Sequence, residues 1–110
     1  MRSFRQGDII WLDFDPQAGH EEGKRRPAII ASGNDALTLI KSLALVCPIT
    51  SHSRPFPTHV ALDDRTKTSG LILCEQVKAL DLDVRNAVFI EKAPDEMIAE
   101  VVNIIHSLLD

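Results

Sequence analysis

Aromatic residues are scarce in this sequence, which holds one Trp, no Tyr and four Phe among 110 residues. Proteins that bind single-stranded nucleic acid mainly by stacking bases on aromatic rings need more of them, so that mode of binding is disfavoured. The first five residues do not lead into the apolar stretch of a secretory signal peptide. No apolar run approaches the length of a membrane span. We therefore expect a cytoplasmic protein with no membrane partner.

Cysteine is equally sparse, and the patterns of several enzyme classes are missing. Cys47 and Cys74 both lie inside apolar runs, which in a cytosolic chain favours reduced thiols in the core over a disulfide. No Cys/His spacing resembles a zinc site, and His52, His59 and His106 share no ligand spacing. The sequence has no HExxH motif, phosphate-binding glycine loop or nucleophile elbow. We therefore predict no metal and no cofactor, and serine, cysteine and metal hydrolases have no support.

The net charge of −4 by itself disfavours a nucleic-acid partner, but the charge is unevenly distributed. From residue 91 onward the chain has five acidic residues and one lysine, and this segment accounts for the whole net charge. The preceding part is neutral. A neutral body with a local basic cluster can still bind a phosphate chain, because the field near the contact decides the attraction.

The length predicts one domain, 1–110. Segment 8–14 alternates, with Ile10, Leu12 and Phe14 on one face. The strands that we predict, each bounded by turn residues, are 8–14, 26–32, 42–50, 58–63, 70–80 and 87–91. The fifth reads either as one long strand or as two with a break near Gln76. Residues 33–38 form a loop or a short helical turn, and 51–57 and 65–70 are loops.

The spacing of apolar residues changes near the C-terminus. There they recur every three or four residues instead of every second residue. Pro94 suits the first helical position, and Asp95 and Glu96 suit the positive end of the helix dipole. This pattern predicts a helix over about 94–109. Its apolar stripe comprises Met97, Ile98, Val101, Val102, Ile105, Leu108 and Leu109. Short antiparallel strands followed by one helix predict a mainly β fold, a small partly open barrel capped by a C-terminal helix.

The segment "HEEGKRR" concentrates titratable groups in one short connection between two predicted strands. Its charged or titratable members are His20, Glu21, Glu22, Lys24, Arg25 and Arg26. They can place an imidazole, carboxylates and guanidinium groups at one point. The alternative is a solvated loop in which the arginines pair with Glu21 and Glu22 for little energy.

Two further polar pairs follow apolar strands. Thr50 and Ser51 follow "LALVCPI", and Glu75 and Gln76 follow "GLILC". A carboxylate on a strand that is still buried needs a basic partner or a raised pKa. The alternatives are that the strand reaches the surface after Cys74, and that Thr50 is an ordinary strand-end residue.

These residue types fit one reaction class. Cleavage of RNA by attack of a ribose 2′-OH on the adjacent phosphate needs neither a metal nor a protein nucleophile. It needs a base for the 2′-OH, an acid for the 5′-oxygen and a cation or hydroxyl on the phosphate oxygens. Glu, His, Arg and Thr side chains can supply these groups.

The sequence also resembles a known family. The segments "GDIIWLDFDPQAGHEEGKRRPAIIAS", "VCPITS" and "TSGLILCEQVKALDLDVR" occur in the order and spacing of the MazF/PemK (Kid) toxins. The resemblance implies an SH3-like barrel that forms a homodimer with an RNA groove across the interface. It also implies a sequence-specific, metal-independent endoribonuclease that cleaves single-stranded mRNA to 2′,3′-cyclic phosphate and 5′-OH ends. A cognate antitoxin would neutralise it, and operator DNA would be contacted only through that antitoxin.

The resemblance also implies roles for individual residues. Arg26, directly before a proline, matches the central catalytic arginine, and Thr50 matches the catalytic threonine of MazF-type members. His20 and Glu21 match an assisting histidine and glutamate of PemK-type loops, and Glu75 matches a PemK-type acid–base residue. The residues expected to contact RNA are Lys24, Arg25, Ser51, Arg54, Gln76, Lys78 and Arg85.

One position departs from the PemK pattern. PemK-type members have an arginine two residues before the acid, expected as the general acid, and this sequence has Leu73 there. Without that neighbour we expect Glu75 to be partly buried with a raised pKa. Two rival functions stay open on the same barrel. They are an inactive or gyrase-poisoning protein of the CcdB type, and an RNA-binding module without enzyme activity.

Overall fold

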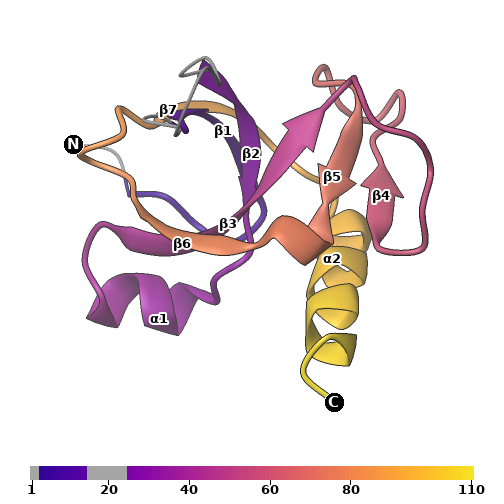
Figure 1. The fold of residues 1–110 in the computed structure, drawn as a ribbon. Helices are drawn as coiled ribbons and strands as arrows, with labels where there is room; N and C mark the ends of the chain where they lie inside the picture. The colour runs from indigo at the N-terminus through magenta and orange to yellow at the C-terminus, as the bar shows by residue number, and fades with distance from the viewer. Residues whose placement is uncertain (1–2, 15–24) are drawn as a thin grey trace, which may run out of the picture.

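The computed structural model describes residues 3–14 and 25–110, which form a curled antiparallel sheet with a helix packed against it (Figure 1). Within these residues there are seven strands. The strands are β1 (Asp8–Asp13), β2 (Arg25–Ile30), β3 (Leu43–Thr50), β4 (His59–Ala61), β5 (Leu71–Leu73), β6 (Lys78–Asp81) and β7 (Val88–Lys92). The helices are α1 (Asn34–Leu39), the 3₁₀ turn η1 (Cys74–Gln76) and α2 (Asp95–Ser107).

The strand β3 organises the sheet because it pairs with three other strands. The order along the sheet is β4-β5-β3-β2-β1-β7, and β6 pairs with β3 outside this path. Between the pairs Ile49↔Ile72 and Val46↔Lys78, β3 advances three residues while the opposite chain advances six. The three additional residues are η1, which bulges out of the ladder. The predicted segment 70–80 is therefore two strands, broken at Gln76 as the second interpretation required.

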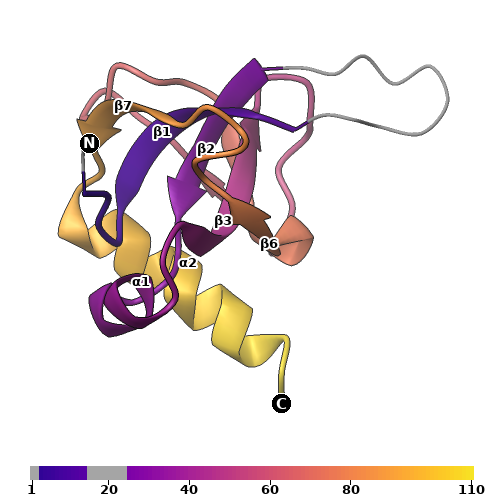
Figure 2. The same cartoon turned by 90° about the vertical axis from the view of Figure 1, so that its left-hand side faces the viewer.

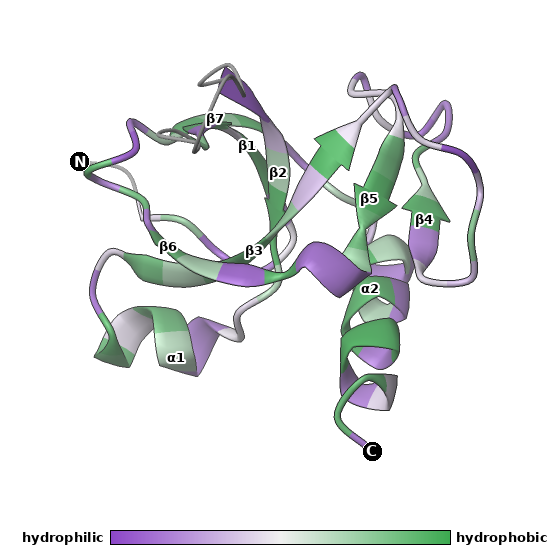
Figure 3. Ribbon diagram, in the orientation of Figure 1, coloured by the Kyte–Doolittle hydropathy of each residue, from purple (hydrophilic) through white to green (hydrophobic). Residues whose placement is uncertain are grey.

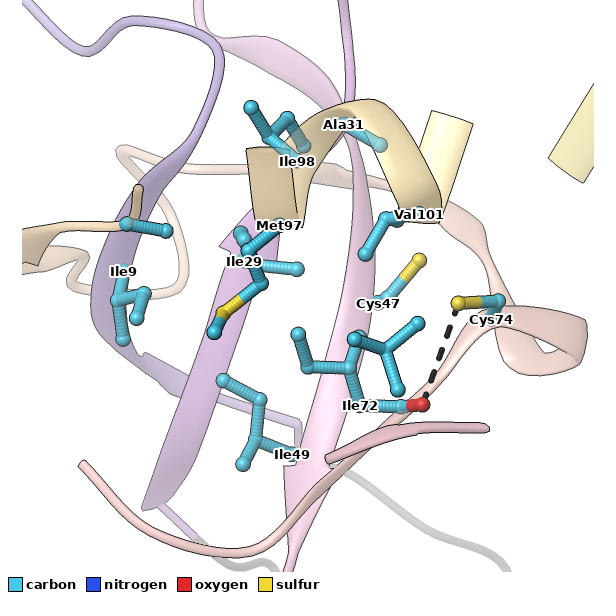
Figure 4. Close-up of a cluster of buried hydrophobic side chains, with 12 residues drawn as sticks. Ile9, Ile29, Ala31, Cys47, Ile49, Ile72, Cys74, Met97, Ile98 and Val101 are labelled. Atoms are coloured by element: carbon cyan, nitrogen blue, oxygen red, sulfur yellow. Dashed lines mark hydrogen bonds between the residues drawn. The ribbon is translucent and has the colours of Figure 1, made fainter. Parts of the chain in front are cut away.

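The sheet has a hydrophobic cluster on each face, and the period-two alternation of the strands sorts residues between them. Ile9, Ile29 and Cys47 belong to the first cluster, which α2 covers (Figures 2 and 4). Ile10, Leu12, Phe14, Ala28, Ile30, Ala44, Val46 and Leu82 form the second cluster, inside the curl of the sheet. The predicted common face of Ile10, Leu12 and Phe14 is thus confirmed.

The C-terminal helix matches its prediction in the middle and differs at both ends. Met97, Ile98 and Val101 are buried in the first cluster. Pro94 has an extended ψ of 144° and is the N-cap rather than the first helical residue. At the other end Leu108 and Leu109 are exposed, because α2 extends past the sheet that it covers (Figure 1). No helix in the described ranges, 3–14 and 25–110, is long and apolar enough to cross a membrane.

Both cysteines are buried free thiols of the first cluster, as predicted. A hydrogen bond to Cys74 and then burial raise the pKa of the Cys47 thiol far above its usual range. Cys47 is therefore a protonated core residue and not a reactive thiolate. The predicted fold class, mainly β in a partly open barrel with a C-terminal helix, is confirmed.

A carboxylate on β7 fixes the long turn between β4 and β5. Glu91 accepts hydrogen bonds from the backbone N–H groups of Lys67 and Thr68, at 3.0 and 2.8 Å, and from the Thr68 hydroxyl at 2.7 Å. Desolvation raises the pKa of Glu91, but these hydrogen bonds outweigh it, and the pKa lies below its usual value.

Replacing Glu91 with Gln should lower the free energy of unfolding by about 1–2 kcal/mol at pH 7, because one acceptor oxygen and its charge are lost. Since the folded pKa is depressed, this contribution is present above the unfolded pKa and disappears as the pH falls through the folded pKa. Urea unfolding at pH 7 and pH 3 measures both effects. Glu96→Gln is the matched control, because its side chain is 89% exposed and its surface ion pair with Arg65 should contribute less than the hydrogen bonds of Glu91. Equal destabilisation by both variants would contradict the assignment.

Candidate functional site

The candidate site surrounds the point where β3 leaves β2. The ladder between these strands includes Ala28↔Pro48, while the last residues of β3 pair with β5. The ladder ends two residues short of Arg26 on β2 and of Thr50 on β3, so these two residues flank the point of divergence. Both positions lie on the sheet face of the second cluster, because each is two residues from the Ala28–Pro48 pair. Figure 1 shows β3 diverging from β2 at this end of the sheet.

Two cationic side chains approach one aromatic ring at this place. The Arg26 Cζ atom lies 6.0 Å from the centroid of the Phe14 ring, and the Lys78 Nζ atom lies 5.7 Å from it. Phe14 is buried at the end of the second cluster, and both distances lie within reach of a cation–π interaction. Side chains from β2 and β6 thus bring positive charge to the same aromatic residue. Lys78 comes from β6, which no sequence pattern links to β2.

The position of Thr50 depends on a close approach of backbone. Gly70 has φ +120°, and a Cβ atom there would lie 2.6 Å from the Thr50 carbonyl oxygen. Only glycine adopts this conformation readily and leaves that space open. The Thr50 hydroxyl accepts a hydrogen bond from the His52 N–H at 3.1 Å. Ser51 and Arg54 follow in an exposed loop.

Glu75 lies on η1 and differs from its prediction. It is exposed, so the alternative in which the chain reaches the surface after Cys74 is correct; Figure 3 shows η1 in hydrophilic colours directly after the hydrophobic β5. Its Oε1 atom accepts a hydrogen bond from the Thr58 hydroxyl at 2.7 Å, and its Oε2 atom lies 3.1 Å from the His59 Nε2 atom.

The predicted rise in the Glu75 pKa is wrong. Desolvation raises this pKa, but the hydrogen bonds from Thr58, the Glu75 backbone N–H and His59 outweigh it, and the net shift is downward. The carboxylate is therefore the stable form of Glu75 at neutral pH. The prediction failed because the partners come from β4 and the residue before it, and a pattern within the segment 70–80 cannot show them.

Two other predicted RNA contacts are tied to Asp13. Arg25 forms an ion pair with Asp13 at 2.9 Å and donates to the Asn86 carbonyl at 2.7 Å. The Arg85 side chain donates to the Asp13 carbonyl at 3.2 Å. Hydrogen bonds from Asn86 and then Arg25 hold the pKa of Asp13 below its usual range. These arginines connect β1, β2 and the turn before β7. Part of their positive charge is therefore balanced by groups of the same chain.

The remaining predicted residues divide into two groups. Gln76 is exposed on η1, next to Glu75. His20, Glu21 and Lys24 lie outside the described residues. Sequence reasoning missed Phe14 as the support of two cations, and it assigned nothing to His59 or Thr58. In the described ranges no group of three or more His, Cys, Asp or Glu side chains is arranged to hold a metal ion.

Comparison with known proteins supports the fold described above. The family model described as PemK-like, MazF-like toxin of type II toxin–antitoxin system matches residues 5–109. The chain belongs to the PemK/MazF toxin family. The match includes every described candidate residue, from Arg25 and Arg26 to Arg85. The resemblance inferred from the sequence is thus confirmed.

Individual PemK/MazF relatives cover most of the chain. The Escherichia coli endoribonuclease PemK is 30% identical over 94% of this chain and 80% of its own length. The endoribonuclease toxin ChpB of Escherichia coli strain K12 is 35% identical over 88% of this chain and 86% of its own length. Among solved structures, a MazE–MazF crystal structure from Deinococcus radiodurans matches with a TM-score of 0.87 and 36% identity, over 99% of this chain and 97% of that one.

Proposed function

We propose that this protein is an endoribonuclease toxin that cleaves single-stranded mRNA at specific sequences without a metal ion. The observation that carries the proposal is that two cationic side chains, Arg26 and Lys78, approach the Phe14 ring on the sheet face that also carries Thr50. In a member of the PemK/MazF family, this arrangement is suited to a phosphate of the RNA backbone.

The reaction can be written with the residues of this chain. The Glu75 carboxylate takes the proton of the ribose 2′-OH while the 2′-oxygen forms a bond to phosphorus. The bond from phosphorus to the 5′-oxygen breaks, and this oxygen takes a proton from solvent, so the ends are a 2′,3′-cyclic phosphate and a 5′-OH. Arg26 and the Thr50 hydroxyl stabilise the charge that develops on the phosphate oxygens. Arg26 can also stabilise the departing oxygen, which matters because Leu73 offers no charge.

Incubation of the pure protein with a long RNA in EDTA tests the proposal. We expect cleavage at a few sites, with cyclic phosphate and 5′-OH ends. Binding without cleavage would indicate an RNA-binding module instead. Neither binding nor cleavage, together with inhibition of DNA gyrase, would indicate the CcdB-type alternative. Loss of cleavage in EDTA that added Mg²⁺ restores would contradict metal independence.

The proposal includes three statements about assembly. The protein works as a homodimer in the cytoplasm, a cognate antitoxin blocks its RNA site, and operator DNA is contacted only through that antitoxin. The solved MazE–MazF relative supports an antitoxin partner. Exposed apolar side chains near β3 and α1, among them Leu39, Ile40, Leu43 and Leu45, offer surface that a dimer would bury. Sedimentation of Leu43→Asp beside the unchanged protein tests the dimer.

Expression of the protein alone should arrest growth, because free enzyme would degrade cellular mRNA. Expression with the product of the neighbouring small gene should restore growth. Arg26→Ala is the control that separates toxicity by cleavage from toxicity by overproduction. Healthy growth with abundant unchanged protein would count against both the enzyme and the antitoxin.

The affinity for RNA should depend on salt even though the body of the protein is neutral. If three or four cations contact phosphates, log K against log salt should have a slope of about −2 to −3, since each single-strand contact contributes about −0.7. Lys78→Gln should reduce the slope by roughly one contact. Lys67→Gln, on the turn that Glu91 holds, should not. A slope near zero would show that the basic residues around Phe14 are not the RNA contacts.

A further inference from the structure

Both ring nitrogens of His59 face hydrogen-bond acceptors. The Nδ1 atom lies 2.9 Å from the backbone carbonyl oxygen of Arg54, and the Nε2 atom lies 3.1 Å from the Glu75 Oε2 atom. A carbonyl oxygen can only accept, so Nδ1 must carry a proton. The contact between Nε2 and the carboxylate then requires one more proton, either on Nε2 or on Glu75.

The surroundings of Glu75 place that proton on the histidine. The carboxylate already accepts the Thr58 hydroxyl hydrogen bond at 2.7 Å, and Glu75 is exposed to solvent, which favours its charged form. An N–H on each ring nitrogen satisfies both acceptors, the Arg54 carbonyl oxygen on one side and the carboxylate on the other. His59 and Glu75 therefore form an ion pair with Nε2–H donating to Oε2.

The side chains of His59 and Glu75 differ in how far they are buried. The His59 side chain is 8% exposed and the Glu75 side chain 36% exposed. The Phe56 ring covers one side of the imidazole, with the ring centroids 5.6 Å apart. His59 thus lies behind Glu75, and neither of its nitrogens is free to exchange a proton with a substrate. Only the carboxylate reaches solvent.

We propose that His59 is the positioning residue of Glu75. Its imidazolium, anchored on the Arg54 carbonyl, holds the carboxylate ionised and oriented while leaving lone pairs of the carboxylate oxygens free for a ribose 2′-OH. The inference rests on the proposed function, in which Glu75 is the base.

The backbone explains why His59 and Glu75 form a pair at this place. His59 lies directly opposite Leu73 in the β4–β5 ladder, and η1 then brings Glu75 back toward β4.

Among the residues that the structure describes, the charged and titratable groups around the imidazole are few. On η1 they are Glu75 and the Cys74 thiol, on α2 the Glu100 carboxylate acts on Cys74, and the loop before β4 carries Arg54. The strand β5 offers only apolar side chains, Leu71, Ile72 and Leu73. The Glu75 carboxylate is the acid in direct contact with the ring, so removal of His59 should act mainly on Glu75.

The first test measures the ion pair without RNA. In the ¹³C spectrum of the unchanged protein we expect the Glu75 carboxyl group to titrate below its usual range, because His59 is among the hydrogen-bond partners that lower its pKa. In His59→Gln the carboxyl ¹³C titration of Glu75 should move to higher pH. An unmoved Glu75 titration in a folded His59→Gln variant would overturn the proposal.

The second test measures cleavage in EDTA across pH 4.5–9 for the unchanged protein, His59→Gln and the exposed control His106→Gln. Removal of the imidazolium should move the acid limb of the profile to higher pH. We divide the cleavage rate of His59→Gln by that of the unchanged protein at each pH. At the acidic end this ratio should be roughly three- to tenfold lower than at pH 8, as expected when a carboxylate loses a cation in contact. His106→Gln should overlay the unchanged protein. A folded His59→Gln variant with an unshifted limb would overturn the positioning role.

The two tests separate this inference from the proposed function. If the unchanged protein cleaves no RNA, the proposed function fails, and the spectra still report whether the pair exists. If the spectra show the pair but the limb stays unshifted in an active enzyme, the proposed function survives and the positioning role fails.

Discussion

Replacing Arg26 with alanine should lower the rate of RNA cleavage by roughly 10²–10³-fold, the usual loss when a preorganised charge stabiliser is removed. The guanidinium is held over Phe14 before any substrate is present, so little reorganisation is needed when charge develops on the phosphate. Single-turnover cleavage of a short RNA with one site measures the effect without interference from product release. The fold should be preserved, because Arg26 lies at the start of β2 and outside the two buried clusters.

Arg26→Lys should not restore the rate. An ammonium group can occupy the place over the ring, but it cannot reproduce the two-pronged contact of a guanidinium with phosphate oxygens. Arg65→Ala is the matched control, since Arg65 is an exposed arginine paired with Asp63 and Glu96. If Arg26→Ala cleaves at the rate of the Arg65 variant, the pair of cations over Phe14 is not where the phosphate is stabilised.

Glu75→Gln should lower cleavage by about 10²–10⁴-fold, the contribution expected of a general base. Glutamine keeps the shape and one acceptor for Thr58 but cannot take a proton. The depressed pKa of Glu75 determines the pH profile of the unchanged protein. The base form persists until the pH falls below the usual range of a carboxyl group, so the rate should be flat near neutrality and decline only in acid. The residual rate of the variant should lack this acid decline.

Glu100→Gln is the control for a lost carboxylate, since Glu100 lies on the exposed side of α2. Thr50→Val should cost less than Arg26→Ala, because it removes one hydroxyl and keeps the shape. If Glu75→Gln cleaves almost normally while the Arg26 and Thr50 variants do not, Glu75 is structural. The reaction would then depend on the arginine and threonine alone.

The strands and the C-terminal helix could be predicted because local periodicity determines them. Alternation in segment 8–14 placed Ile10, Leu12 and Phe14 correctly, and the three–four spacing located α2. The ends were less accurate. Leu108 and Leu109 fit the stripe but lie beyond the sheet that the helix covers. The extent of a neighbouring element is not encoded in a helix's own period.

The candidate site was only partly predictable, because its groups meet through strand pairing. Family resemblance located Arg26, Thr50 and Glu75, but the register between β3 and the chain after β5 decides what lies beside each. Three residues in η1 shift that register, placing Lys78 opposite Val46 and leaving Glu75 outside the ladder. The partners of Glu75 come from a loop and from β4. Thr58 and His59 belong to a short alternating segment that reads as ordinary strand.

The triple pairing of β3 has a consequence for local unfolding. One end of the strand carries β5, the other carries β6, and β2 pairs along its middle. Its side chains contribute to both hydrophobic clusters. Neither half of the sheet can therefore open by itself without exposing the shared strand and apolar surface from both clusters. The structure around β3 should behave as one cooperative unit, and its amide hydrogens should be among the slowest to exchange with solvent. Arg26, Thr50 and Lys78 lie on or beside this unit, so their relative placement should persist until the whole sheet unfolds.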